Sequence, residues 1–114
     1  MRRFEGLAAV EAAIGEPLGS SPWHEVTQGE ISMFADATHD HYWIHTDPQR
    51  AADGPFGATV AHGLLTLSLV PLFISEVYAV DGLQLMLNYG FNKVRFPAPT
   101  PVGSRVRGQV EIAS

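Results

Sequence analysis

The sequence predicts an α+β protein in which one long buried helix packs against a mostly antiparallel sheet. The helix is predicted by "VAHGLLTLSLVPLFISEVYAV", residues 60–80, which is apolar on almost every side over about five turns. The sheet is predicted by residues 83–112, which are strand-like and contain a Pro-rich turn. The 114 residues show no internal repeat, and this length fits a single domain over residues 1–114.

The first quarter of the chain predicts a short helix and a strand. "LAAVEAAIG", residues 7–15, has helical spacing, and Gly15 followed by Pro17 is a good stop signal. "SPWHEV", residues 21–26, is a strand candidate. Glutamates at positions 5, 11 and 16 interrupt the residues after the two N-terminal arginines, so no apolar signal-peptide segment is expected.

Two capped helices are predicted next. Thr27 stands three residues before Glu30, the capping-box spacing in which each side chain meets the backbone N–H of the other residue. A helix should therefore begin there and run out near Ala37, which leaves residues 38–45 as a loop. Asp47, followed directly by a proline, predicts the cap of a second helix.

One proline lies inside the long predicted helix. Pro71 has no backbone N–H, so it should kink the helix or leave a carbonyl free one turn earlier, near Leu67. The longest apolar stretch, residues 63–74, is shorter than the roughly 20 residues that cross a bilayer. A soluble cytoplasmic protein is therefore expected.

Charge and composition exclude several classes of partner and site. The net charge is −5 and the seven Lys and Arg are scattered, so no footprint for nucleic acid or an anionic membrane is present. With no cysteine, the chain has no disulfide, thiolate metal site or cysteine nucleophile. The charged fraction of 17% is low, which suggests that a subunit interface covers part of the surface.

Residues 36–45, "DATHDHYWIH", place three of the five histidines around an aspartate. His41 and His45 are four apart and His39 precedes them, but the segment lacks its own helix cap and zinc usually takes three or four protein ligands, so a metal is disfavoured. In the structural alternative, Asp40 is a turn residue and His45 a core histidine bonded to backbone. In the acid/base alternative, Asp40 and His45 face one water molecule and move its proton.

The start of the long helix supplies further candidates. Gly63 lies in its first turn, where a bare N–H at a helix N-terminus can stabilise charge on a carbonyl oxygen and the missing side chain admits a substrate. His62 and Ser68 are weaker candidates for substrate contact. His62 can instead cap its helix or pack under the preceding loop, and Ser68 can bond back to a helix carbonyl.

Together, "DHYWIH", "DPQRA", "VAHGLLTLSL" and "VRFPAPTPVGSRVRG" resemble the MaoC-like dehydratase family, the R-specific enoyl-CoA hydratases (hydratase 2), and within it the NodN-like branch. The resemblance covers residues 27–110. It implies a hot-dog fold, in which an antiparallel sheet wraps a long helix, usually in a dimer with a CoA thioester at the subunit interface. It also implies that Asp40 and His45 are catalytic and that Gly63 supplies the oxyanion-hole amide.

The chain departs from the family pattern G-D-x-N-P-I-H at three positions. His39 replaces the glycine, Tyr42 the asparagine and Trp43 the proline. Because the asparagine normally helps to hold the loop, Tyr42 and Trp43 bear on loop geometry and substrate range. Arg95 is the first candidate to bind CoA phosphates, although strand arginines are more often solvated. The other cations considered are Lys93, Arg105 and Arg107.

The resemblance predicts the reversible, R-specific hydration of trans-2-enoyl-CoA without a cofactor. Two rivals stay open, a non-catalytic subunit that binds acyl thioesters and a thioesterase, because one fold hosts several functions. A homodimer with the site near its interface is expected. One or two more strands are implied after Ser114, so either the chain is truncated there or a partner chain closes the sheet edge.

Overall fold

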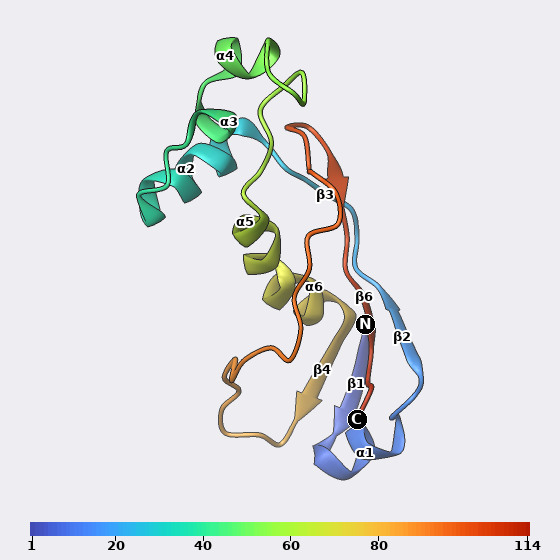
Figure 1. The fold of residues 1–114 in the computed structure, drawn as a ribbon. Helices are drawn as coiled ribbons and strands as arrows, with labels where there is room; N and C mark the ends of the chain where they lie inside the picture. Colours follow the sequence, from blue (N-terminus) through green and yellow to red (C-terminus); the bar gives the residue numbers. More distant parts are fainter. The chain divides into compact units, whose positions relative to one another are not determined.

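The structure is a computed structural model that describes all 114 residues, with six helices and six short strands (Figure 1). The α+β class predicted from the sequence is confirmed. Contacts within the chain define two compact units. Unit 1 contains residues 1–22, 70–94 and 107–114, and unit 2 contains residues 23–69 and 95–106.

Unit 1 is built from two helices and two small sheets. Its elements are β1 (Arg2–Glu5), α1 (Gly6–Ala12), β2 (Pro17–Ser20), α6 (Val70–Val77), β4 (Tyr78–Asp81) and β6 (Gln109–Glu111). β1 pairs with β4 in parallel, and β2 pairs with β6 antiparallel. Arg3 donates two hydrogen bonds to the Asp81 carboxylate, at 2.7 and 3.1 Å, and these bonds lower the pKa of Asp81. This pair adds a side-chain link between β1 and β4.

Unit 2 contains the other helices and one small sheet. Its elements are β3 (His24–Glu25), α2 (Gln28–Thr38), α3 (Trp43–Thr46), α4 (Pro48–Ala52), α5 (Gly63–Ser68) and β5 (Arg105–Val106). β3 and β5 pair antiparallel. The core consists of four buried apolar side chains with three partly buried neighbours, namely Val26, Ile31, Ala61 and Leu65 with Phe34, Val102 and Val106. Phe34, at the edge of this core, also contacts the ring of His62.

The caps of α2 and α4 confirm the predicted helix starts. The Thr27 hydroxyl accepts from the Glu30 N–H at 3.2 Å, and the Glu30 carboxylate accepts from the Thr27 N–H at 3.3 Å. The Asp47 carboxylate accepts from the Arg50 N–H at 3.1 Å at the start of α4. These contacts are local in sequence, so their spacing could identify them.

The long predicted helix is present as two helices separated at Leu69. α5 ends at Ser68 and α6 begins at Val70. Pro71 cannot donate to the carbonyl four residues earlier, and its ring crowds that carbonyl, so the helix is interrupted close to the proline. The Leu69 N–H instead donates to the Thr66 carbonyl at 3.2 Å. The prediction of helix to residue 80 was wrong, because Tyr78–Asp81 pairs with β1 as a strand.

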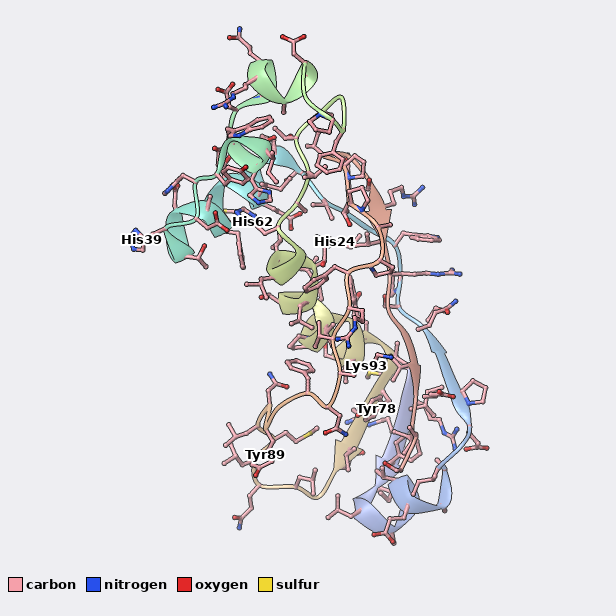
Figure 2. All side chains as sticks on the ribbon, viewed as in Figure 1. His24, His39, His62, Tyr78, Tyr89 and Lys93 are labelled. Atoms are coloured by element: carbon pink, nitrogen blue, oxygen red, sulfur yellow. The ribbon has the colours of Figure 1, made fainter.

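The prediction of a strand at the start of the segment 83–112 was also wrong. Residues 83–99 contain no strand, and within the segment 83–112 strands appear only at β5 and β6. A strand needs a neighbouring strand to accept its N–H groups and to donate to its carbonyls, and no β-sheet of this chain includes these residues. Leu87 is 80% exposed, and Tyr89, in the loop that follows β4, is fully exposed (Figure 2).

The N-terminal strands β1 and β2 were missed because "RRFE" and "PLGS" carry no apolar alternation. The strand predicted over residues 21–26 is reduced to β3, His24–Glu25. The first helix ends at Ala12, three residues before the predicted stop at Gly15, and turn residues fill the interval. No helix in the structure combines the length and the apolar character that crossing a bilayer requires.

Candidate active site

His45 is held by its own side chain against the backbone of residue 60. It lies in α3, a single helical turn in a region predicted as loop, where the His45 N–H donates to the Tyr42 carbonyl at 3.0 Å. The prediction of loop is therefore wrong for residues 43–45. His45 is 9% exposed, and its Nδ1 lies 2.7 Å from the Val60 carbonyl. Because a carbonyl only accepts, Nδ1 carries the proton and the neutral ring keeps its lone pair on Nε2.

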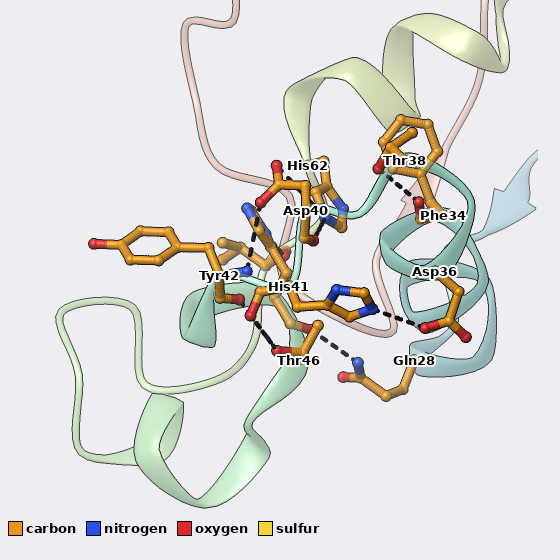
Figure 3. Close-up of polar contacts among 11 residues, drawn as sticks. Gln28, Phe34, Asp36, Thr38, Asp40, His41, Tyr42, Thr46 and His62 are labelled. Carbon is orange, nitrogen blue, oxygen red and sulfur yellow. Dashed lines mark hydrogen bonds and ion pairs between the residues drawn. The ribbon is translucent and has the colours of Figure 1, made fainter.

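Gln28 and Thr59 hold the backbone of His45. The Gln28 side-chain amide donates to the His45 carbonyl at 2.9 Å (Figure 3), and its oxygen accepts from the Thr59 hydroxyl at 2.6 Å. Thr59 is only 2% exposed, so this hydroxyl depends on a protein partner. The Val60 N–H also donates to the Ile44 carbonyl at 3.0 Å. Gln28 thus anchors the backbone of His45 and Thr59 holds Gln28, and sequence analysis missed both residues.

Asp40 lies in the short link between α2 and α3, with its side chain 53% exposed. Its carboxylate accepts a long bond of 3.4 Å from the Tyr42 N–H. One oxygen of Asp40, one nitrogen of His45 and one nitrogen of His62 all lie within 4.8 Å of one another. Two hydrogen bonds through one water span about this distance. Asp40 and His45 can therefore bind the same water molecule.

His62 lies beneath both candidate catalytic residues. It is 3% exposed, and its Nε2 lies 3.0 Å from the Asp40 backbone carbonyl and 4.0 Å from the Asp40 carboxylate (Figure 3). Its ring stacks on that of His45, with centroids 3.8 Å apart and planes inclined by 22°. Its Nδ1 is buried without a hydrogen-bond partner. The structure thus packs His62 under the loop, which was the structural alternative for this residue.

Gly63 begins α5, so its N–H has no acceptor within the helix. A Cβ at this position would lie 2.9 Å from the ring of Phe96, closer than two carbon atoms normally approach. Phe96 therefore gives a structural reason for glycine in addition to the predicted approach of a substrate. Gly63 and Phe96 line a cavity of about 240 Å³ with Phe56, Ala61, Thr66 and residues 97–100.

The remaining predicted site residues are more peripheral. Tyr42 is 57% exposed, and its ring lies edge-on to His45 with centroids 6.4 Å apart. The Ser68 hydroxyl donates to the Leu64 carbonyl at 2.7 Å, as its structural alternative predicted. Arg95 is exposed, immediately before Phe96 in the chain. The structure therefore brings Asp40, His45 and His62 together, while Ser68 bonds within its own helix.

The residues do not fit a metal well, although a carboxylate and two imidazoles are suitable ligand types. His45 and His62 each use one ring nitrogen on a backbone carbonyl, and their rings stack nearly parallel. Lone pairs that lie in two stacked ring planes do not converge on one ion at the usual Zn–N distance of about 2 Å. His41, considered as a ligand from the sequence, pairs instead with Asp36 at 2.8 Å.

The backbone at His39 shows that one departure from the family pattern carries a conformational cost. His39 caps the end of α2 in the left-handed conformation, with φ of 62°, and is the one residue other than glycine with a positive φ in this chain. Glycine adopts this conformation without strain, whereas histidine adopts it at some cost. The family pattern has glycine at this position, which would adopt the left-handed conformation without strain. His39 points away from the cluster, on the exposed end of α2 (Figure 2).

The family follows from comparison of the whole chain. Residues 9–114 match the model of the MaoC like domain. The chain belongs to the MaoC-like family. The solved structures similar to this MaoC-like chain are hot-dog proteins, so the predicted fold class is confirmed.

Three relatives of this MaoC-like chain stand out. It is 60% identical over 107 residues to the 3-hydroxyacyl-thioester dehydratase Z of Mycobacterium tuberculosis, covering 94% of this chain and 71% of that protein. It is 50% identical to the nodulation protein N of Rhizobium leguminosarum bv. viciae, over 90% of this chain and 65% of that protein. This match confirms the predicted NodN-like similarity. The (R)-hydratase from A. caviae, involved in PHA biosynthesis, aligns with 84% of this chain and 71% of its own at 26% identity, with a TM-score of 0.62.

Proposed function

We propose that this chain catalyses the reversible addition of water to a trans-2-enoyl thioester, giving an (R)-3-hydroxyacyl thioester. The observation that carries the proposal is the placement of Asp40 and His45. One atom of each lies within 4.8 Å of the other, and His45 Nδ1 is committed to the Val60 carbonyl. The relatives named as a dehydratase of 3-hydroxyacyl thioesters and as an (R)-hydratase support the reaction and its stereochemistry.

The first step forms the bond between water and C3 of the enoyl group. His45 Nε2 accepts a proton from a water molecule that the Asp40 carboxylate orients, because Nε2 holds the free lone pair. As the oxygen–C3 bond forms, the C2=C3 electron pair moves toward the thioester carbonyl. Positioned proton transfer of this kind contributes about 10²- to 10⁴-fold to the rate.

The second step returns the proton. The enolate-like oxygen of the thioester accepts a hydrogen bond from the Gly63 N–H, which has no acceptor within α5. C2 then takes a proton from the Asp40–His45 pair, so the proton removed from water is the one restored. The balance is one water added across C2=C3, and no external oxidant, reductant or cofactor is consumed.

Two exposed residues are proposed to contact the substrate. Tyr42 is proposed to touch the acyl thioester, because it is exposed and its ring lies beside His45. Arg95, also exposed, is proposed as a cation for the phosphates of CoA. His62 and Ser68 are not proposed as substrate contacts, because His62 is buried and the Ser68 hydroxyl already donates to Leu64.

The active form is proposed to be a homodimer with the site near its interface. The loop after β4 exposes large apolar side chains, namely Leu85, Met86, Leu87, Tyr89 and Phe91. Burying apolar surface contributes about 25 cal/mol for each Å² removed from water, and twofold dimers are the commonest closed assembly. Sedimentation across the assay range tests this proposal. An active, stable monomer at assay concentration would refute it.

Hydration is tested with crotonyl-CoA and longer trans-2-enoyl-CoA thioesters. Loss of the absorbance of the conjugated thioester, without release of free thiol, is the expected result. Release of thiol in step with the absorbance change would instead identify a thioesterase. No change with any enoyl thioester, together with saturable binding of acyl-CoA, would identify a non-catalytic binding subunit.

A further inference from the structure

We propose that His62 is a positioning residue that fixes the Asp40 loop relative to the His45 ring. The proposal rests on the proposed function for what Asp40 and His45 do, but its geometry can be tested without substrate. A histidine directly before Gly63 was considered above as a substrate contact, a helix cap or a residue packed under the loop. The contacts give the packed histidine a positioning task as well.

His62 touches both candidate catalytic residues with different parts of one side chain. Its Nε2 donates to the backbone carbonyl of Asp40 at 3.0 Å, and its ring face stacks on His45 at 3.8 Å. These residues lie five apart in the chain, on the two sides of the α3 start. A single side chain therefore links the backbone of Asp40 to the ring of His45. Misplacing reacting groups by about 1 Å can cost roughly 10²-fold in rate.

The hydrogen bond to Asp40 matters because the other contacts of this loop fall on the residues after it. The Thr46 hydroxyl lies 3.0 Å from the His41 carbonyl and 3.2 Å from the Tyr42 carbonyl. The Asp40 carboxylate accepts only a long bond of 3.4 Å from Tyr42 and is half exposed. The preceding residue, His39, holds a left-handed conformation that a side chain disfavours. The bond from His62 holds Asp40 in place directly after this strained residue.

Packing alone does not account for a histidine at this position. His62 is 3% exposed and its Nδ1 is buried without a partner, which is unfavourable for any polar atom. A phenylalanine would fill similar space against Phe34 and His45 without a buried, unpaired nitrogen. What phenylalanine cannot supply is the N–H that reaches the Asp40 carbonyl. The buried, unpaired Nδ1 is a cost that this single donor offsets.

Burial also separates this role from substrate binding. A side chain that is 3% exposed, with its one donor occupied by backbone, has no face left for an incoming acyl thioester. The effect of His62 must therefore pass through Asp40 and His45. Loss of His62 should lower kcat, whereas KM should stay close to its original value.

Two substitutions separate the two contacts. His62→Phe keeps an aromatic ring against His45 and removes the donor, while His62→Gln keeps an amide N–H at the reach of Nε2 and removes the ring. We expect His62→Phe to lower kcat by about 10²-fold with KM changed less than about threefold. His62→Gln should recover most of that loss. Both variants should be folded, as checked by urea denaturation.

The matched control is His41. It adjoins Asp40 in the chain, but its ring is half exposed and pairs with Asp36. His41→Phe and His41→Gln make the same chemical changes beside the same loop, and they should leave kcat and KM unchanged. In the Asp40→Asn background, His62→Phe should cost little further activity, because it acts through Asp40.

A readout without substrate distinguishes this proposal from the proposed function. The ¹³C shift of the Asp40 backbone carbonyl in the free protein should change in His62→Phe and should stay near the wild-type value in His62→Gln. An unchanged carbonyl shift in His62→Phe would overturn the positioning role. So would wild-type kcat in that variant, or equal losses from the His62 and His41 substitutions. If the carbonyl responds as expected but no enoyl thioester is hydrated, the proposed function fails and the positioning geometry stands.

Discussion

The pair formed by Gln28 and Thr59 offers a sharp quantitative test of how His45 is held. In Gln28→Leu, the Thr59 hydroxyl, which is 2% exposed, loses the acceptor 2.6 Å away, and the His45 carbonyl loses its donor at 2.9 Å. Each buried polar group left without a partner costs about 1 to 3 kcal/mol. Two such groups would cost about 2 to 6 kcal/mol if fully buried, and because both bonds are only partly buried the free energy of unfolding should fall by about 2 to 4 kcal/mol.

Thr59→Val alone should cost less, about 1 kcal/mol, because Gln28 is only partly buried and water can reach its oxygen. When both partners become apolar, neither is left unpaired by the other. The double variant should therefore cost at least about 1 kcal/mol less than the sum of the single changes. Urea denaturation of all four proteins, with equal slopes, measures this difference. Additive losses within about 0.5 kcal/mol would refute the coupling, as would a near-neutral Gln28→Leu.

Three further results are expected. His39→Gly should raise the free energy of unfolding by up to about 1 kcal/mol in urea titrations, because φ at this residue is 62°. For the same reason His39→Val should lower it by about 1 to 2 kcal/mol. Equal stabilities of these variants and the wild type would contradict backbone strain at His39. Gly63→Ala should lower both kcat and stability, the latter by about 1 kcal/mol, because its Cβ meets the Phe96 ring at 2.9 Å. Stability should then return in Gly63→Ala combined with Phe96→Leu, and no recovery would show that the ring is not the obstacle. Dialysis against EDTA should leave kcat unchanged, and loss of activity that zinc restores would replace the acid/base pair with a metal.

Sequence alone could identify the parts of the site that are encoded by local spacing. The capping box of Thr27 and Glu30 spans three residues, and the Asp47 cap reaches the N–H of Arg50. The Asp40–His45 pair lies within five residues, so its proximity also followed from spacing. Spacings of three to five residues can be recognised without knowledge of the tertiary fold.

The residues that hold the pair could not be found in this way. Gln28 and Thr59 are 31 residues apart, and His62 and Asp40 are 22 apart. Hydrogen bonds over such separations leave no periodicity or composition signal in a single sequence. His62 was noticed for its neighbour Gly63, yet its donor and its stacked ring become visible only when α5 is placed beside α3.

The wrong strand prediction over residues 83–99 has a different cause. Strand-like composition over residues 83–99 predicts which residues favour an extended backbone, but it does not supply a partner strand. No β-sheet of this chain includes these residues, and side chains such as Leu87 and Tyr89 stay exposed. Conversely, β1 forms despite its polar sequence because β4 lies beside it in register. Pairing decides both outcomes.

The central claim is that Asp40 and His45 act as one unit on a water molecule. The most direct measurement is kcat for crotonyl-CoA hydration by wild type, Asp40→Asn, His45→Gln and the double variant. Each single change should lower kcat by at least about 10²-fold with the fold intact, and the double variant should lose little more than either. Wild-type turnover in either single variant, or losses that multiply in the double variant, would contradict the claim.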